Sequence, residues 1–150
     1  MAQSLAQIYI HIVFSTKERR PFIQTDIESE LYAYIAGAIK KMDGFPCLIN
    51  GTADHVHILS ALPRTVTIAK FIEGIKRPSS QWIKTKGQMY QKFAWQNGYG
   101  AFSVSSSRMD SVKRYITCQK EHHRELSFKE ELLEFLRKYN VQYDERYLWD

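Results

Sequence analysis

Hydrophobic and polar residues alternate near the beginning of the chain. From Ile8 to Phe14 every second residue is apolar, whereas His11 occupies one of the alternate positions. Successive side chains of a strand point to opposite faces, so this period of two predicts a strand over residues 8–15 with one apolar and one mixed face. The basic segment KERRP that follows predicts a loop.

The next segment changes to helical spacing. Thr25 and Glu28 have the spacing of a capping box, in which a hydroxyl and a carboxylate satisfy each other's backbone N–H groups at the start of a helix. Gly44 is expected to end this helix. Its apolar residues recur every three or four positions and form one buried stripe: Ile27, Leu31, Ile35, Ala38, Ile39 and Met42.

Two apolar runs after the first helix predict a β-hairpin. The runs are Phe45–Thr52 and Val56–Leu62. The dipeptide Asn50-Gly51 is typical of a two-residue turn, but a turn at Ala53-Asp54 leaves strands of more equal length. We therefore favour the second turn.

Helical spacing returns near Thr65 or Thr67. Pro78 is expected to end or kink this second helix, because proline has no N–H and its ring clashes with the preceding turn. Residues Ser79–Lys86 can then resume a helical turn. The next predicted element is a short strand over Ala101–Ser105. Ser107 and Asp110 are then expected to cap a helix that runs to about Glu125. A last helix is predicted at about Phe128–Tyr139.

The order of predicted elements is β-α-β-β-α-β followed by helices. This order predicts an α+β fold with a ferredoxin-like (RRM-like) antiparallel sheet, two helices on one face and the other face available for a site. No repeat or low-complexity linker divides the chain, so residues 1–150 are expected to form a single domain. Because this fold hosts many activities, topology alone does not identify the function.

Composition narrows the class of protein. Lys and Arg number 21 against 16 Asp and Glu, and the net charge of +5 favours a polyanionic partner. No apolar stretch reaches the length of a membrane span, and the run Ile8–Phe14 lacks the features of a signal peptide, so we expect a cytoplasmic protein without membrane contact. Cys47 and Cys118 are too few for a disulfide framework and have no zinc-type spacing.

The segment DHVHIL contains two histidines two positions apart. On a strand, His55 and His57 would point to the same side while Val56 and Ile58 face the core. Two imidazoles on one pleat can bind one divalent ion if a further ligand comes from elsewhere. An isolated pair of this kind is also typical of histidines on a surface. A metal site therefore requires a further ligand from another part of the chain.

The helix predicted to run to about Glu125 carries a tyrosine that can act as a nucleophile beside a metal ion. Tyr115 and Gln119 are four residues apart and would project from one helix face. A tyrosine hydroxyl can attack a phosphodiester and form a covalent phosphotyrosine, and the glutamine carbonyl can complete a ligand set. Packing is the alternative role for a lone helical tyrosine, and the chain has nine.

Four segments together resemble the single-tyrosine HUH transposases of small insertion sequences, the IS200-like family. HUH denotes two histidines separated by a hydrophobic residue. The similarity runs in order along the chain up to about Leu126, so it does not reflect composition. The segments are Tyr9–Lys17, Asp54–Leu59, Trp95–Ser105 and Tyr115–His123.

The resemblance implies roles for particular residues. His55 and His57 match the HUH metal ligands, Gln119 matches the third ligand, and Tyr115 matches the nucleophile. It further implies a DNA transposase that uses Mg²⁺ or Mn²⁺ to nick and rejoin single-stranded DNA with hairpin ends, leaving a 5′-phosphotyrosine and a free 3′-hydroxyl. Members of the family are homodimers in which the tyrosine helix can act in trans, that is, on the other subunit.

Basic and aromatic residues outside this set are candidate DNA contacts. We expect phosphate contacts from a set of five cations: Lys17, Arg19, Arg20, Lys76 and Arg77. Tyr99 can stack on a base, whereas Phe102 is expected to pack in the core. His11 should share a sheet face with the HUH pair, where it either touches DNA or supports the site. His122 and His123 can bind metal or phosphate, or cap the end of their helix.

Three other functions remain open at this stage. A domesticated relative would cut genomic hairpins without mobilising its own gene. A non-catalytic nucleic-acid binding module would carry exposed aromatics on its central strands, where this chain has histidines. A histidine phosphoesterase would need further histidine motifs, but Leu59 occupies the next alternating position.

Overall fold

A four-stranded antiparallel sheet forms the centre of the structure. The computed structural model describes residues 2–122 and 126–150, with the side chain of residue 122 excepted. Its sheet has the order β2-β3-β1-β4, which confirms the predicted ferredoxin-like topology. The strands are β1 (Tyr9–Ser15), β2 (Phe45–Gly51), β3 (His55–Ala61) and β4 (Gly100–Val104).

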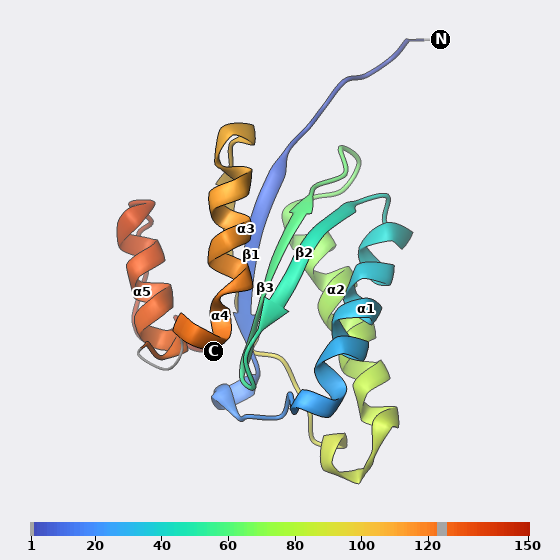
Figure 1. Cartoon of the computed structure of the whole chain (residues 1–150), viewed down its shortest axis with the longest axis vertical. Coiled ribbons are helices and arrows are strands. Elements are labelled where there is room, and N and C mark those ends of the chain that lie inside the picture. Colours follow the sequence, from blue (N-terminus) through green and yellow to red (C-terminus); the bar gives the residue numbers. More distant parts are fainter. Residues whose placement is uncertain (1, 123–125) are drawn as a thin grey trace.

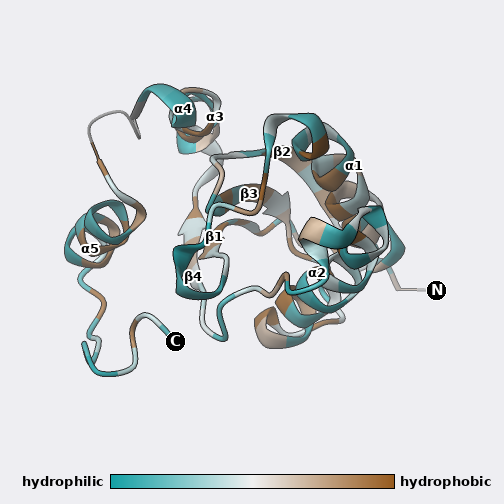
Figure 2. Cartoon of the chain, turned by 90° about the horizontal axis from the view of Figure 1, so that it is seen from below, coloured by the Kyte–Doolittle hydropathy of each residue, from teal (hydrophilic) through white to brown (hydrophobic). Residues whose placement is uncertain are grey.

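Helices cover both faces of this sheet (Figure 1). Two long helices, α1 (Thr25–Lys41) and α2 (Ile68–Ile83), lie on one face. Seen from below, three helices lie on the other side of the sheet (Figure 2): α3 (Met109–Thr117), α4 (Gln119–His122) and α5 (Phe128–Lys138). Short 3₁₀ turns occur at Lys17–Arg19, Lys84–Lys86, Gln88–Tyr90 and Ser106–Arg108. Within the described residues, no helix has the length and apolar character needed to span a membrane.

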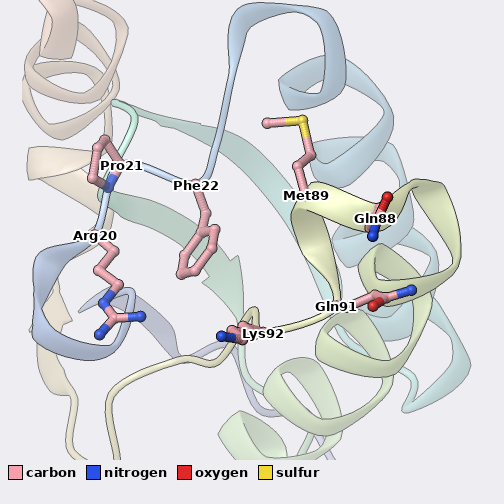
Figure 3. Close-up of a pocket in the computed structure, with 7 residues that line it drawn as sticks. All are labelled: Arg20, Pro21, Phe22, Gln88, Met89, Gln91 and Lys92. Carbon is pink, nitrogen blue, oxygen red and sulfur yellow. The ribbon is translucent and has the colours of Figure 1, made fainter.

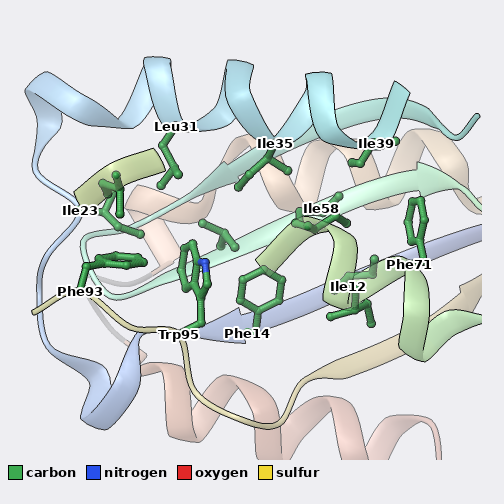
Figure 4. Packing of buried hydrophobic residues seen from close by; sticks show 14 of the residues in the cluster. Ile12, Phe14, Ile23, Leu31, Ile35, Ile39, Ile58, Phe71, Phe93 and Trp95 are labelled. Atoms are coloured by element: carbon green, nitrogen blue, oxygen red, sulfur yellow. The ribbon is translucent and has the colours of Figure 1, made fainter. Parts of the chain in front are cut away.

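The main core lies between the sheet and the α1–α2 layer (Figure 4). Ile12 and Ile58 on adjacent strands belong to the same buried cluster as Leu31 and Ile35 of α1, and all four side chains are fully buried. This packing follows from the two periods in the sequence, since alternation places one strand face and helical spacing one helix stripe against each other. The sheet is therefore anchored from one side, and its opposite face carries the polar residues.

The hairpin turn is the one favoured from the sequence. Gly51 still pairs with Val56, and the Thr52 N–H donates to the His55 carbonyl at 3.0 Å, so the turn contains Ala53-Asp54. The predicted last helix is also confirmed. Ser127 caps it by accepting a hydrogen bond from the Glu130 N–H at 3.2 Å.

Two predicted helix caps are wrong. Gln24 precedes α1 with extended backbone, and Thr25 is already helical, so no side-chain capping bond forms there. Ser107 lies inside a 3₁₀ turn, and α3 likewise begins without a side-chain cap. In both cases backbone hydrogen bonds hold the segment before the helix. The Ile23 N–H donates to the Ala53 carbonyl at 2.9 Å before α1, and the Arg108 N–H donates to the Ser105 carbonyl at 2.9 Å before α3.

Pro78 does not end α2, which continues to Ile83. Proline removes only its own N–H from the helix ladder. The next turn is stabilised by one bond within the helix and one tertiary bond. The buried Ser79 hydroxyl donates to the Ile75 carbonyl at 2.7 Å and accepts from the Trp95 indole at 3.0 Å. Packing therefore overrides the local preference.

The helix predicted to run to about Glu125 breaks at Cys118, which has φ −92° and ψ 18°. Helix α3 ends at Thr117, and α4 begins at Gln119. The break changes the direction of the chain between Tyr115 and Gln119, the two residues expected on one helix face.

Candidate active site

His55 and His57 lie side by side on β3, as the alternation predicts. Their ring centroids are 5.3 Å apart, and both side chains are fully buried on the sheet face opposite Val56 and Ile58. His11 on the neighbouring strand hydrogen-bonds through Nε2 to His57 Nδ1 at 2.7 Å. Burial, followed by the nearby His57, lowers the pKa of His11 to about 3. His11 is therefore a neutral ring that supports His57.

A polar turn fixes the orientation of His55. Its Nδ1 atom lies 2.7 Å from Asp54 Oδ1 and 2.9 Å from Thr52 Oγ1. Although burial lowers the pKa of His55, hydrogen bonds and charge from Asp54 and Glu131 raise it to about 9. A carboxylate on one ring nitrogen orients the other toward a ligand position, as at many metal-binding histidines. Here the Nε2 atom faces Gln119 Oε1 at 3.3 Å.

Glu131 brings a buried carboxylate from α5 to this pair of histidines. Its Oε1 atom lies 2.8 Å from His57 Nε2 and 3.5 Å from His55 Nε2. One ligand atom each from His55, His57 and Glu131 lie within 4.8 Å of one another, and all three residues are buried. Two imidazoles and a carboxylate are a suitable ligand set for a divalent transition metal, and their closeness fits a single ion.

Glu131 is not among the site residues predicted from the sequence. A signal was present, because Glu131 falls within the apolar stripe of the last helix between Phe128, Leu132 and Leu136. Glutamate is almost never fully buried unless it is paired. A glutamate at such a position therefore predicts a buried polar partner.

Tyr115 lies next to the same carboxylate. Its hydroxyl donates to Glu131 Oε2, and its ring centroid is 5.8 Å from that of His57. Burial and then Glu131 raise the pKa of Tyr115 above its ordinary value, so the phenol keeps its proton in this arrangement. Gln119 is fully buried and donates through Nε2 to Glu131 Oε2 at 3.3 Å. The structure thus brings together all four predicted site residues, despite the break at Cys118.

The sheet face expected to be open is covered by α3 and α5. Phe128, Leu132 and Leu136 of α5 form a second core with Val13 and Phe102 of the sheet. The packing role expected for Phe102 is confirmed by its burial. The apolar positions on this face, which alternate with the histidines, are what hold α5 in place.

The predicted phosphate contacts near β1 lie at the His55 end of the sheet, because Ser15 pairs with His55. Lys17 and Arg20 are exposed, and Arg20 pairs with Glu18 at 3.0 Å. Arg20 also lines a pocket of about 550 Å³, in which Phe22 lies between the Arg20 segment and the segment that bears Lys92 (Figure 3).

The other predicted contacts lie in different surroundings. The Arg19 guanidinium is partly buried, 6.0 Å from the centre of the Trp149 ring. Arg77 is exposed on α2, 3.6 Å from Glu73. Tyr99 is 42% exposed, with Lys76 Nζ 5.6 Å from the centre of its ring, and its stacking role stays a prediction. His123 and the side chain of His122 lie outside the described residues.

Lys76 is engaged inside the protein. Its Nζ atom donates to the carbonyls of Gln96, Asn97 and Gly98 at 2.8, 3.3 and 2.6 Å. Burial lowers the pKa of Lys76 to about 8. The ammonium group therefore holds the loop before β4 in place, a role that the sequence analysis did not predict.

Replacing this lysine should destabilise the fold. We expect Lys76→Ala to lower the free energy of unfolding by about 2 kcal/mol, because three carbonyls lose a charged donor. Urea unfolding measures the change. Lys70→Ala, at an exposed position of the same helix, is the matched control and should change it by less than about 0.5 kcal/mol. Equal stabilities for the two variants would contradict the structural role.

Comparisons with known proteins identify the family and the fold. The family model described as "Transposase IS200 like" matches residues 4–119. No sequence among curated proteins is similar enough to match. A crystal structure from Deinococcus radiodurans R1, described as a transposase, is similar with a TM-score of 0.62 and 17% identity over 79% of this chain and 98% of that one. A REP-associated tyrosine transposase bound to a REP hairpin gives 0.60 and 13%, over 82% of this chain and 74% of that one.

Proposed function

Because the chain belongs to the IS200-like transposase family, we propose that it nicks and rejoins single-stranded DNA through a 5′-phosphotyrosine on Tyr115. One observation carries the proposal: a phenol and two strand histidines converge on the buried carboxylate of Glu131. A nucleophile beside a ligand set suited to a divalent cation is the arrangement that metal-assisted phosphodiester cleavage requires.

His55, His57 and Glu131 would hold Mg²⁺ or Mn²⁺, with the Gln119 carbonyl beside them. When bound, the cation polarises the scissile phosphate and stabilises the charge that develops on its oxygens. The protein supplies the orientation. Asp54 and Thr52 fix one ring of the pair, and His11 fixes the other.

In the cleavage step, the Tyr115 oxygen forms a bond to phosphorus as the bond from phosphorus to the 3′-oxygen breaks. Glu131 Oε2 already accepts the hydrogen bond of the phenol, which makes it the nearest acceptor for the phenolic proton. The departing oxygen takes up a proton and becomes a free 3′-hydroxyl. Rejoining is the reverse reaction with a 3′-hydroxyl as nucleophile, so the phosphotyrosine conserves the energy of the original bond.

We propose hairpin-bearing single-stranded DNA as the substrate and a homodimer as the assembly. The REP hairpin on a relative of the same fold supports the first. Tyr115 lies beside His57 of its own chain, which supports cleavage in cis within this arrangement. Glu131 lies beyond the matched residues 4–119, so residues 1–150 would act as one domain.

The test is covalent capture. Labelled single strands with a hairpin are incubated with the protein and Mn²⁺ or Mg²⁺, and a protein–DNA adduct is sought on a denaturing gel. The proposal requires an adduct together with a released fragment that ends in a 3′-hydroxyl. Cleavage without any protein-linked DNA would identify a hydrolytic nuclease instead.

Gln119 should contribute less than the histidines. We expect Gln119→Ala to weaken Mn²⁺ binding about tenfold while adduct formation recovers at high Mn²⁺, because water can fill the vacated position. Calorimetric titration measures the affinity. Gln81→Ala, at an exposed position on α2, is the control and should bind like the native protein. Identical binding by Gln119→Ala would remove this residue from the ligand set.

A further inference from the structure

A cleft runs between α3 and α5 from the surface to Tyr115. Its inner part, of about 350 Å³, is lined by His11, Tyr115 and Glu131. Its outer part, of about 340 Å³, reaches Ser103 and Ser105 at the end of β4. The two parts share a set of lining residues, so they form one passage: Arg108, Ser111, Val112, Lys138 and Tyr139. Each volume lies within the range of about 300–1,000 Å³ that is typical of ligand pockets.

The shared walls of this α3–α5 cleft carry groups that suit a nucleotide. Arg108 on one wall and Lys138 on the other are exposed cations that line both parts. Cations neutralise phosphates. The Ser111 hydroxyl donates to the Arg108 carbonyl at 3.0 Å and so links α3 to the segment that bears Arg108. Besides Glu131, the acidic residue that lines the cleft is Glu134, and it lines only the inner part. Positive charge is therefore in excess at the mouth, whereas in the inner part Glu131 and Glu134 balance the two cations.

Tyr139 supplies a platform for a base. Its ring stacks on Phe102 with centroids 4.8 Å apart and planes at 16°, and the residue remains 36% exposed. The ring also stacks on Phe135 with centroids 6.3 Å apart, and Lys138 Nζ lies 5.9 Å from its centre. A ring held in this way and still partly exposed can receive a base with little loss of side-chain freedom. Stacking on an aromatic residue contributes about 1–3 kcal/mol per base and is tolerant of sequence.

We propose that the α3–α5 cleft guides the DNA strand to Tyr115, with a phosphate held between Arg108 and Lys138 and a base stacked on Tyr139. The inference rests on the proposed function and adds the path of the substrate. It gives α5 a second role as a wall of the substrate site. Lys138 and Tyr139 lie beyond the family match at residues 4–119, so this part of the path rests on the geometry of the C-terminal segment alone.

Binding can be measured without cleavage. In a Tyr115→Phe background, the anisotropy of a labelled single strand reports affinity over a series of salt concentrations. We expect Arg108→Ala and Lys138→Ala each to weaken binding five- to tenfold and to reduce the salt slope by about 0.7, the value for one phosphate contact on a single strand. Lys113→Ala on α3 and Arg137→Ala on α5 each remove one positive charge outside the cleft and should change affinity less than twofold.

Substitutions of Tyr139 distinguish the contribution of base stacking from that of charge. Tyr139→Ala should weaken binding at least fivefold and Tyr139→Phe should restore it, and 5-iodouracil in the strand should crosslink to Tyr139 on irradiation. Unchanged affinity in all three alanine variants, or equal losses in the Lys113 and Arg137 controls, would overturn the proposed path.

The two proposals fail in different ways. If the native protein forms no adduct while the cleft variants lose affinity, the strand path stands and the tyrosine chemistry is wrong. If adducts form normally in Arg108→Ala and Lys138→Ala at DNA concentrations below saturation, the chemistry stands and the path is wrong.

Discussion

Tyr115→Phe is expected to lower the rate of adduct formation at least about 1000-fold, because the substitution removes the attacking oxygen. The ring should stay in place. It contacts His57 and Phe135 at centroid distances of 5.8 and 5.5 Å, and these contacts do not involve the hydroxyl. The measurement is the yield of protein–DNA adduct on a denaturing gel, followed over time with a hairpin-bearing single strand and Mn²⁺.

A second tyrosine provides the control for this experiment. Tyr32 lies on α1, on the other side of the sheet, and its pKa is raised by burial and then by Glu28. Tyr32→Phe removes one hydroxyl from the protein without touching the site and should form the adduct at the native rate. An undiminished adduct in Tyr115→Phe would show that another residue is the nucleophile.

The sequence was sufficient to predict the parts of the site that depend on local periodicity. Alternation on β3 places His55 and His57 on one face, and the structure has both there. The topology places β1 beside β3, which predicts that His11 joins them. These predictions succeed because a strand has a fixed period and a ferredoxin-like sheet has a fixed order.

The sequence was not sufficient where the outcome depends on long-range packing. Helical spacing identifies the apolar stripe of α5, but it does not say which surface that stripe covers. The hydrophobic residues Val13 and Phe102 decide this, since α5 packs on them and so carries Glu131 to the histidines. Lys76 illustrates the same limit, because its three carbonyl partners lie about twenty residues along the chain.

The covered sheet face changes what is expected of a histidine substitution. His57 is fully buried and hydrogen-bonds to His11 at 2.7 Å and to Glu131 at 2.8 Å. Had the face been open, His57→Ala would leave stability unchanged. In this structure it deprives two buried polar groups of a partner, at a cost of about 1–3 kcal/mol each. Loss of activity alone therefore does not identify His57 as a ligand.

A metal-dependent stability measurement resolves this ambiguity. We expect Mn²⁺ at about 100 times its dissociation constant to stabilise the native protein by about 2.7 kcal/mol, because the ion binds only the folded state. His57→Ala should lose most of this gain, and its adduct formation should fall at least about 100-fold, since the remaining ligands hold the ion weakly. Thermal unfolding with and without Mn²⁺ measures the gain in stability, over a temperature range that begins where the variant is folded. The denaturing gel measures adduct formation.

A destabilised control with an intact site completes the test. Ile35 is fully buried on α1, on the opposite side of the sheet from the histidines, and Ile35→Val should cost about 1 kcal/mol by leaving a small cavity. This variant should keep the full Mn²⁺-dependent gain and the native rate of adduct formation. If His57→Ala also keeps the gain, His57 is not a ligand of the ion, and its hydrogen bond to Glu131 serves only to hold α5 on the sheet.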